Sequence, residues 1–267
     1  MLNAKNIHFC IRQRPIVEQA DISLQAGELL AVLGSNGAGK STLLKILSGE
    51  ISCKQGDIRY NGVSLSDYSS KALARVRAVM SQHSTLSFPY KAMEVVELGL
   101  GNQTVSSPDE LLREVMVETQ TWELRDRQYG KLSGGEKQRV QLARVLIQIW
   151  EIKPYPRYLL LDEPTSSMDI AQQHHVLQIV SRLKERNIGV LAIVHDLNLA
   201  AAYADNVALL KDGMICHQGA TASVMTSENL EKVFDHPVKV VKDPENDQLI
   251  IISQVQTKKI KHEFKLA

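Results

Sequence analysis

A glycine-rich stretch near the N-terminus, GSNGAGKST at positions 34–42, constrains the fold of this 267-residue chain more than any other feature. It matches the pattern G-x-x-x-x-G-K-[ST], in which glycines let the backbone curl so that its N–H groups surround phosphate oxygens. An apolar run typical of a strand precedes the stretch, and the apolar-periodic segment STLLKILSG follows it as a helix. This context favours a nucleotide-phosphate site over a glycine-rich turn without a ligand. The expected phosphate contacts are Gly34, Ser35, Asn36, Gly37, Ala38, Gly39, Lys40, Ser41 and Thr42.

The order of the apolar segments predicts an α/β fold. NIHFCI and DISLQAGELLAVLG are typical of strands, and Asn61-Gly62 in GDIRYNGVSL predicts a hairpin. A long helical stretch follows, and then the apolar strands YLLL, VLAIV and VALL alternate with helices, which implies a parallel sheet. We therefore expect one domain with an α/β core at 1–86 and 157–240, a helical insertion at 87–156, and C-terminal strands with a basic tail at 241–267.

Composition excludes several classes of protein. The formal net charge is +1, so no global field favours a nucleic-acid partner. The three cysteines contain no C-x-x-C pair, which favours reduced thiols in the cytosol over a disulfide or zinc framework. The N-terminus has no signal-peptide core, and the apolar runs are shorter than the roughly 20 residues that cross a bilayer. We expect any association with a membrane to be peripheral.

Two adjacent carboxylates end the apolar strand in RYLLLDEPT. Next to a phosphate loop, one of Asp162 and Glu163 can hold Mg²⁺, directly or through water, while the other orients an attacking water. In the loop itself, Lys40 would reach the β- and γ-phosphates and the Ser41 hydroxyl would bind Mg²⁺. His195 also follows an apolar strand, but taken alone a histidine there is more often structural.

The segment KLSGGEKQRVQLARVL, at 131–146, begins as a bare turn and continues as a helix. Ser133 and Glu136 fit the S-x-x-E capping box, which needs no ligand. Alternatively, Gly134 and Gly135 leave the backbone N–H groups of the helix start open to an anion. Taken alone, this segment favours the cap.

The order of these motifs is similar to that in the ATP-binding subunits of ABC transporters, over nearly the whole chain. The motifs are the phosphate loop, Gln82 in VMSQHS, LSGGE at 132–136, LLLDEPT, and His195. The resemblance implies a P-loop NTPase (RecA-like) core with an N-terminal antiparallel β part and an inserted α-helical subdomain. It also implies a head-to-tail homodimer that binds ATP and Mg²⁺. Ser133, Gly134 and Gly135 of one copy would contact the γ-phosphate held by the other copy, so both interpretations of this segment would hold.

The same resemblance implies roles for single residues. Ser41, Gln82 and Asp162 would form the metal site, with Asp162 acting through water and Gln82 sensing Mg²⁺ and the attacking water. Glu163 would be the general base, and His195 would hydrogen-bond the γ-phosphate. The catalytic set would thus be Glu163, His195 and Gln82.

Two further expectations come from the resemblance. Asp169 would reach across the dimer. The aromatic residue that stacks on adenine in the family is replaced by Ile11, so adenine would rest either on Phe9 or on an aliphatic surface beside Arg12 or Arg14.

One branch of the family is favoured, the ATPases that energise import of iron chelates, haem and cobalamin. The segment VHDLNLAAAYAD resembles this branch as a whole. The long segment QIWEIKPYPRY and HHVL at 174–177 resemble hemin-import ATPases in particular. Import of a ferric siderophore or cobalamin and a soluble, non-transport ATPase are the alternatives. His174 and His175 are expected on a solvated helix face, not as haem ligands.

The resemblance implies partners as well. We expect two copies of a permease, a periplasmic binding protein acting indirectly, no direct contact with the cargo, and a place on the cytoplasmic face of the inner membrane. The segment STLSFPYKAMEVV, after Gln82, would form the groove for a permease helix.

Overall fold

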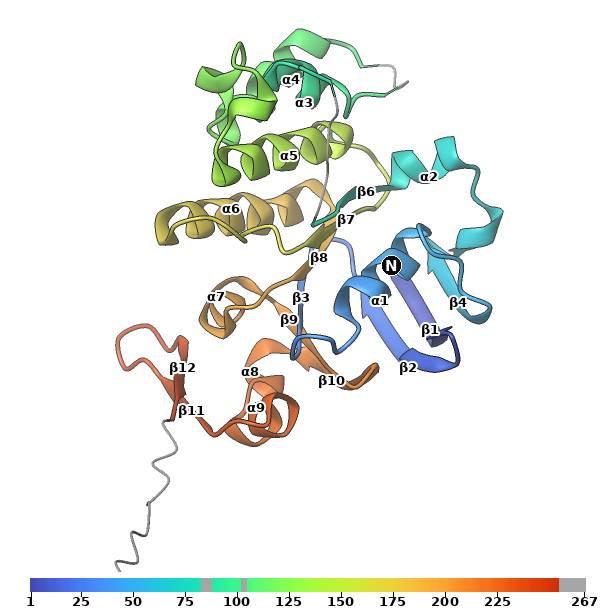
Figure 1. Ribbon diagram of the computed structural model, residues 1–267, viewed down its shortest axis with the longest axis vertical. Coiled ribbons are helices and arrows are strands. Elements are labelled where there is room, and N and C mark those ends of the chain that lie inside the picture. Colours follow the sequence, from blue (N-terminus) through green and yellow to red (C-terminus); the bar gives the residue numbers. More distant parts are fainter. Residues whose placement is uncertain (83–87, 102–104, 255–267) are drawn as a thin grey trace, which may run out of the picture.

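The computed structural model describes residues 1–82, 88–101 and 105–254. In these residues a six-stranded sheet runs through the middle of the molecule (Figure 1). The strand order is β10 (Met214–Ala220), β9 (Asn206–Lys211), β3 (Leu29–Leu33), β8 (Ile188–Ile193), β7 (Arg157–Asp162) and β6 (Arg77–Met80). All neighbours are parallel except β9 and β10. The predicted α/β fold is therefore confirmed.

A second, antiparallel sheet lies beside α1 (Lys40–Ser48) (Figure 1). Its order is β2 (Arg14–Leu24), β1 (Leu2–Ile11), β4 (Gln55–Tyr60) and β5 (Val63–Ser64). The predicted hairpin is confirmed, because β4 and β5 pair across Asn61 and Gly62, whose φ angles of 53° and 84° suit the favoured two-residue turn.

One expected strand is wrong. DISLQAGELLAVLG is not continuous: β2 ends at Leu24 and β3 begins at Leu29, and the two belong to different sheets. Gly27 lies between them with φ of 78°, a left-handed conformation that glycine adopts without a steric penalty. The turn thus moves the chain from the antiparallel sheet into the central one.

Helices cover both faces of the central sheet. Between β4 and β7 lie η1 (Leu65–Asp67), α2 (Ser70–Val76), α3 (Ala92–Glu97), α4 (Pro108–Glu118), η2 (Trp122–Leu124), η3 (Tyr129–Lys131) and α5 (Gly134–Ile149). After β7 come α6 (Ile170–Arg182), η4 (Leu183–Arg186), α7 (Leu197–Tyr203), α8 (Thr221–Val224) and α9 (Ser227–Phe234). The chain then forms the C-terminal hairpin of β11 (Val238–Lys242) and β12 (Leu249–Ser253), as predicted.

The central strands are buried on both faces, and alternate residues serve two separate cores. In β3, Leu29, Ala31 and Leu33 pack with the α3–α7 side of the molecule, whereas Leu30 and Val32 pack with α1 and the antiparallel sheet. This explains why the strand sequences are continuously apolar and not alternating. Packing on both faces of the central sheet fixes the positions of the strand ends from which the polar loops extend.

Four polar motifs follow parallel strands at the same edge of the sheet. The phosphate loop follows β3, Glu163 follows β7 and His195 lies two residues after β8. Gln82 lies two residues after β6. Since the carboxyl ends of parallel strands meet at one edge, the topology places the motifs together.

Candidate nucleotide site

Glycines in the phosphate loop allow close backbone approaches. A Cβ atom at Gly34 would lie 2.2 Å from the Leu210 carbonyl oxygen, and one at Gly39 would lie 2.5 Å from the Ile16 carbonyl oxygen. Gly37 and Gly39 have φ angles of 81° and 103°, and Gly39 caps α1. The loop therefore curls in front of the positive end of a helix, the arrangement that binds phosphate.

The Lys40 side chain bends back over this loop. Its Nζ donates to the carbonyl oxygens of Gly34 at 2.8 Å and Ser35 at 2.9 Å. Burial lowers the pKa of Lys40, while the carboxylates of Glu163 and Asp162 raise it. The ammonium is thus held at the loop, where a phosphate would meet it.

Oxygen donors suited to Mg²⁺ lie beside Lys40. The Ser41 hydroxyl donates to Oδ1 of Asp162 at 3.0 Å, and Asp162 is buried. Burial raises the pKa of Asp162, and the hydrogen bond from Ser41 lowers it. Among the described residues, no group of three or more His, Cys, Asp and Glu side chains could hold a metal. One carboxylate and one hydroxyl fit Mg²⁺, which usually takes its other ligands from water and substrate phosphates.

Glu163 brings the three predicted catalytic residues together. Its Oε1 lies 2.5 Å from His195 Nε2, and its Oε2 accepts a hydrogen bond from Gln82 Nε2 at 2.8 Å. Only 16% of the Glu163 side chain is exposed, against 45% for His195. The contacts join side chains from the ends of β6, β7 and β8.

The backbone at Glu163 is strained, since its φ is 53°. The turn after it is held from α5: Gln138 Nε2 donates to the Glu163 carbonyl oxygen at 2.7 Å and to Ser166 Oγ at 3.0 Å. Ser166 Oγ also donates to the Glu163 carbonyl oxygen. Sequence reasoning missed Gln138. The available signal was its position one helical turn after Gly134, on the same side of α5.

Ile16 is a second residue that sequence reasoning missed. The pairing of β1 with β2 passes from Phe9–Val17 to Cys10–Pro15, so Ile16 is an extra residue that forms a bulge in β2. It lines a cavity of about 210 Å³ together with phosphate-loop residues, Glu163 and His195. Ile16 therefore joins the candidates for the adenine contact.

The two residues named for adenine lie in different surroundings. Phe9 is half-buried and packs against the core beside α1, whereas Ile11 is 52% exposed near the end of the hairpin. The choice between them stays a prediction. The bulge at Ile16 favours an aliphatic surface.

The capping box at the start of α5 is confirmed. Ser133 Oγ accepts the Glu136 N–H at 3.3 Å, and Glu136 Oε2 accepts the Ser133 N–H at 2.7 Å. Arg127 adds a hydrogen bond to Glu136 at 2.8 Å. The hydrogen bonds from Ser133 and Arg127 lower the pKa of Glu136.

Gly134, at the start of α5, and the phosphate loop line different hollows of the chain. Gly134 lines a cavity of about 460 Å³ together with Gln82, Gln138 and Asp162. The cavity at the phosphate loop is lined by none of residues 133–135. Within one described chain, the predicted γ-phosphate contacts are therefore split between two places.

Asp169 is the N-cap of α6, where its Oδ1 accepts the Gln172 N–H at 2.9 Å. The prediction that the two histidines of α6 lie on a solvated face is wrong. His174 and His175 are half-buried, and they hydrogen-bond the Tyr203 hydroxyl at 2.8 Å and the Glu118 carbonyl oxygen at 3.0 Å.

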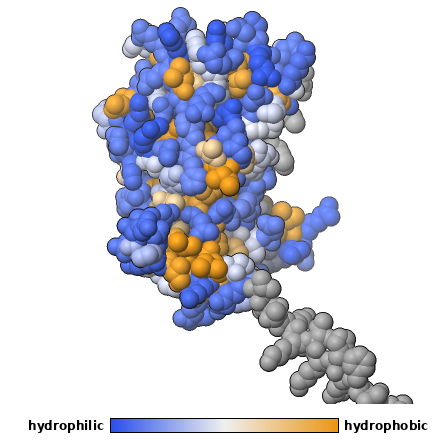
Figure 2. Space-filling model, turned by 90° about the vertical axis from the view of Figure 1, so that its left-hand side faces the viewer, coloured by the Kyte–Doolittle hydropathy of each residue, from blue (hydrophilic) through white to orange (hydrophobic). Residues whose placement is uncertain are grey.

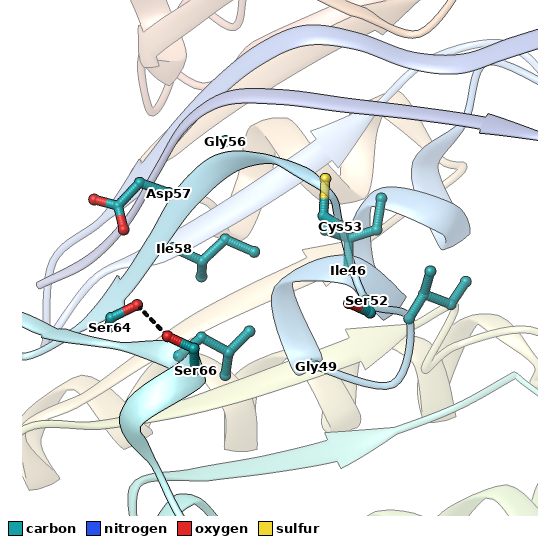
Figure 3. Close-up of a pocket in the computed structure, with 11 residues that line it drawn as sticks. Ile46, Gly49, Ser52, Cys53, Gly56, Asp57, Ile58, Ser64 and Ser66 are labelled. Atoms are coloured by element: carbon teal, nitrogen blue, oxygen red, sulfur yellow. Dashed lines mark hydrogen bonds between the residues drawn. The ribbon is translucent and has the colours of Figure 1, made fainter.

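Another hollow lies between the end of α1 and the β4–β5 hairpin (Figure 3). It has a volume of about 420 Å³, and residues from Ile46 to Ser66 line it. The Cys53 thiol beside it donates to the carbonyl oxygens of His8 and Gln55. None of the residues predicted for the nucleotide site lines this hollow.

The fold and the site together define a P-loop protein built to bind a nucleoside triphosphate. A family model described as ABC transporter matches residues 17–166. The chain belongs to the ABC transporter family, as one of its ATP-hydrolysing subunits.

Individual relatives cover almost the whole chain. A hemin import ATP-binding protein, HmuV, from Escherichia coli O157:H7 is 39% identical over 253 residues, which are 94% of this chain and 99% of the relative. HmuV from Gloeobacter violaceus is 45% identical over 249 residues, covering 91% and 90%. The solved structure of a metal-chelate type ABC transporter, in an inward-facing conformation, matches with a TM-score of 0.78 at 26% identity, covering 96% of this chain and 98% of that one.

Proposed function

We propose that this protein hydrolyses ATP to energise import of hemin through a membrane permease. The observation that carries the proposal is its similarity to two hemin import ATP-binding proteins over nine-tenths or more of each chain. In the described residues, no helix is long and apolar enough to cross a membrane. By its similarity to these import ATP-binding proteins, the protein would act at the cytoplasmic face of the inner membrane by binding a permease.

The phosphate loop and Lys40 would hold the triphosphate. Loop N–H groups donate to the phosphate oxygens, and the Lys40 ammonium, already placed over Gly34 and Ser35, neutralises part of their charge. Ser41, Asp162 and Gln82 would hold Mg²⁺, with Asp162 acting through water. When bound, the metal neutralises charge that develops on the β- and γ-phosphates.

Glu163 would act as the general base. Its carboxylate accepts a proton from the attacking water, while Gln82 keeps the carboxylate oriented through its contact with Oε2. Without nucleotide, His195 Nε2 contacts Oε1 of Glu163; His195 is the more exposed of the two and would turn its Nε2 to the γ-phosphate once a nucleotide is present. The Gln82 contact then restricts Glu163 to a geometry that favours in-line attack.

A second copy of the chain would complete the site. Ser133, Gly134 and Gly135 lie at the start of a 16-residue helix whose dipole favours an anion. Because none of them lines the cavity at the phosphate loop of their own chain, the anion would be the γ-phosphate of an ATP held by the phosphate loop of another chain. A head-to-tail homodimer would then hold two ATP molecules between its subunits, with Asp169 lying near the subunit boundary.

The permease would dock between α2, the end of α3 and α5. A groove of about 400 Å³ there includes three cations, Lys71, Arg75 and Arg144, and the half-exposed Leu98. These suit a short permease helix that carries both acidic and apolar side chains. Of the segment first expected to form the permease groove, residues 84–87 lie outside the described residues, and none of residues 88–96 lines this groove. The hemin itself would contact the permease and a periplasmic binding protein, not this chain.

The test is hemin transport in proteoliposomes that contain this subunit, its permease and the periplasmic binding protein. We expect hemin uptake that requires ATP, and a Glu163→Gln variant that still binds ATP but loses turnover by about a thousandfold. Ferric siderophore and cobalamin serve as competing cargoes. Uptake of either in place of hemin would overturn the cargo, and full turnover by Glu163→Gln would overturn the role of Glu163.

A further inference from the structure

Helix α7 begins directly after the loop that connects it to β8 and carries His195, so the position of the helix sets the position of that loop. Asp196 is its N-cap, and Oδ1 of Asp196 accepts the N–H groups of Asn198 at 2.7 Å and Leu199 at 3.0 Å. Leu199 and Ala200 are buried against the sheet. The distance between His195 and Glu163 therefore depends on the position of a helix of only seven residues.

The C-terminal hairpin holds α7 through one side chain. Asn198 Nδ2 donates to the Ile251 carbonyl oxygen at 3.2 Å, and Asn198 Oδ1 accepts the Ile251 N–H at 2.8 Å. One amide thus satisfies both backbone groups of a residue in β12, as a neighbouring strand would. Figure 1 shows β12 beside α7.

The same strand inserts Ile251 into the core on the α3–α7 side of the sheet, where it is 8% exposed. Its neighbours Ile250 and Ile252 face outward and are 37% and 47% exposed. Figure 2 shows an apolar area on the face that carries α7 and β12, near the point where the described chain ends. Strand β12 is therefore anchored to the α7 side by Ile251 and Asn198. Strand β11 is held by α9, where Glu231 accepts the Val238 N–H at 3.2 Å and Ser227 Oγ accepts the Val240 N–H at 2.9 Å.

The other end of α7 is held independently. The Tyr203 hydroxyl lies 2.8 Å from His174 Nδ1, and their rings are 5.6 Å apart. Asn198 lies one residue after the start of the helix, closer to His195. A shift of β12 would thus reach the His195 end first.

We propose that Asn198 is a positioning residue for ATP hydrolysis: it ties α7 to the C-terminal hairpin and so keeps His195 at the edge of the sheet, within reach of Glu163 and of the γ-phosphate. This inference rests on the role proposed for His195. The inference gives the C-terminal hairpin a function in the reaction, although none of the hairpin's residues lines the nucleotide site.

The test is a double-mutant cycle on the full-length chain. We expect Asn198→Ala to lower kcat roughly tenfold while KM for ATP changes by less than about twofold. In a His195→Ala background, Asn198→Ala should cause no further loss, because the residue it positions is gone. Asn229→Ala is the matched control: it removes a bond from another C-terminal asparagine to a backbone carbonyl, that of Val224, and should leave kcat unchanged.

The outcomes separate this inference from the proposed function. An unchanged kcat for Asn198→Ala, or an equal further loss in the His195→Ala background, overturns the positioning role alone. Full activity of His195→Ala overturns the proposed role of His195 and the inference with it. Asn198→Asp keeps the acceptor for the Ile251 N–H, so the same cycle with this variant serves if Asn198→Ala fails to fold.

Discussion

At the scale of single residues, the buried carboxylate of Asp162 lowers the stability of the folded chain at neutral pH. Its carboxylate is 2% exposed, lies beside Glu163 and has Ser41 as its side-chain donor. Because folding raises its pKa, the folded chain binds this proton more tightly than the unfolded chain does. The contribution of Asp162 to stability thus decreases as the pH rises from the unfolded pKa through the folded one, and the full penalty acts at neutral pH.

Asp162→Asn should therefore stabilise the ligand-free chain at pH 7. The gain appears as a rise in Tm, because burial penalises the ionised carboxylate and not a neutral amide. The same variant should lose Mg²⁺-dependent ATP hydrolysis, since the amide cannot replace the charge. Thermal unfolding at pH 7 and pH 4 measures the first effect, and the gain should be smaller at pH 4. A lower Tm at pH 7 would contradict the account.

The phosphate loop and the adjacent Asp162 and Glu163 could be predicted from their spacing, whereas Gln82 and His195 were expected only from the resemblance to ABC transporter ATPases. The sequence did not predict Ile16 or Gln138. Ile16 lines the site because of a bulge that pairing between two strands creates. Gln138 holds the turn after β7 only because α5 packs there. The partners in such tertiary contacts are distant in the sequence, so no local pattern identifies them.

At the scale of elements, the Asn61-Gly62 turn does more than reverse the chain. Asn61 Nδ2 donates to the Pro156 carbonyl oxygen at 3.0 Å, and Asn61 Oδ1 accepts the Tyr158 hydroxyl at 2.8 Å. The turn therefore links the antiparallel sheet to the beginning of β7. The hairpin was predictable from Asn-Gly, but this link was not, since its partners lie 95 and 97 residues away.

Tyr158→Phe removes one of these hydrogen bonds and keeps the buried ring. We expect a loss of about 1 kcal/mol in the free energy of unfolding, since an Asn61 oxygen is left without its donor. ATPase activity should stay at the wild-type level because Tyr158 lies at the start of β7, five residues from Glu163. Urea unfolding of both proteins measures the difference, and an equal stability would argue against the link.

Two short or polar strands were missed for physical reasons. β6 has only four residues, and β10 is a polar strand at the edge of the sheet with few buried side chains. Neither presents the continuous apolar run that marked the strands buried on both faces. The division of DISLQAGELLAVLG into two strands was not predicted, because only the four residues 25–28 separate β2 from β3 and no strong turn pair marks them.

At the scale of the whole molecule, the groove beside α2 should transmit force to the permease. Leu98→Asp places a carboxylate on an exposed apolar position of that groove, so it should weaken permease binding at least tenfold. ATP hydrolysis by the isolated subunit should be unchanged, because the groove lies away from the phosphate loop. Co-purification with the permease and ATPase assays measure both effects. Met214→Asp, at another exposed apolar position, is the control and should leave binding intact.

Pairing of two chains is the central claim, and the two glycines of α5 differ as places to test it. A Cβ at Gly135 would lie 3.0 Å from Gln172 Oε1 in the same chain, so a substitution there disturbs local packing. At Gly134 the nearest atom would be Ser167 Cβ at 3.5 Å, an ordinary contact. Gly134→Asp therefore adds a charge that repels phosphate and leaves the fold intact. Gly134→Ala is the uncharged control and should keep most of the activity.

Mixing two inactive variants tests this claim most directly. Lys40→Ala loses its phosphate loop, and Gly134→Asp loses the turn that the other chain needs, so each alone should be inactive. In a mixed dimer, the intact loop of one chain meets the intact turn of the other, and random pairing should restore about a quarter of the wild-type ATPase rate. If each site is instead complete within one chain, the mixture will stay as inactive as its components, and the account is contradicted.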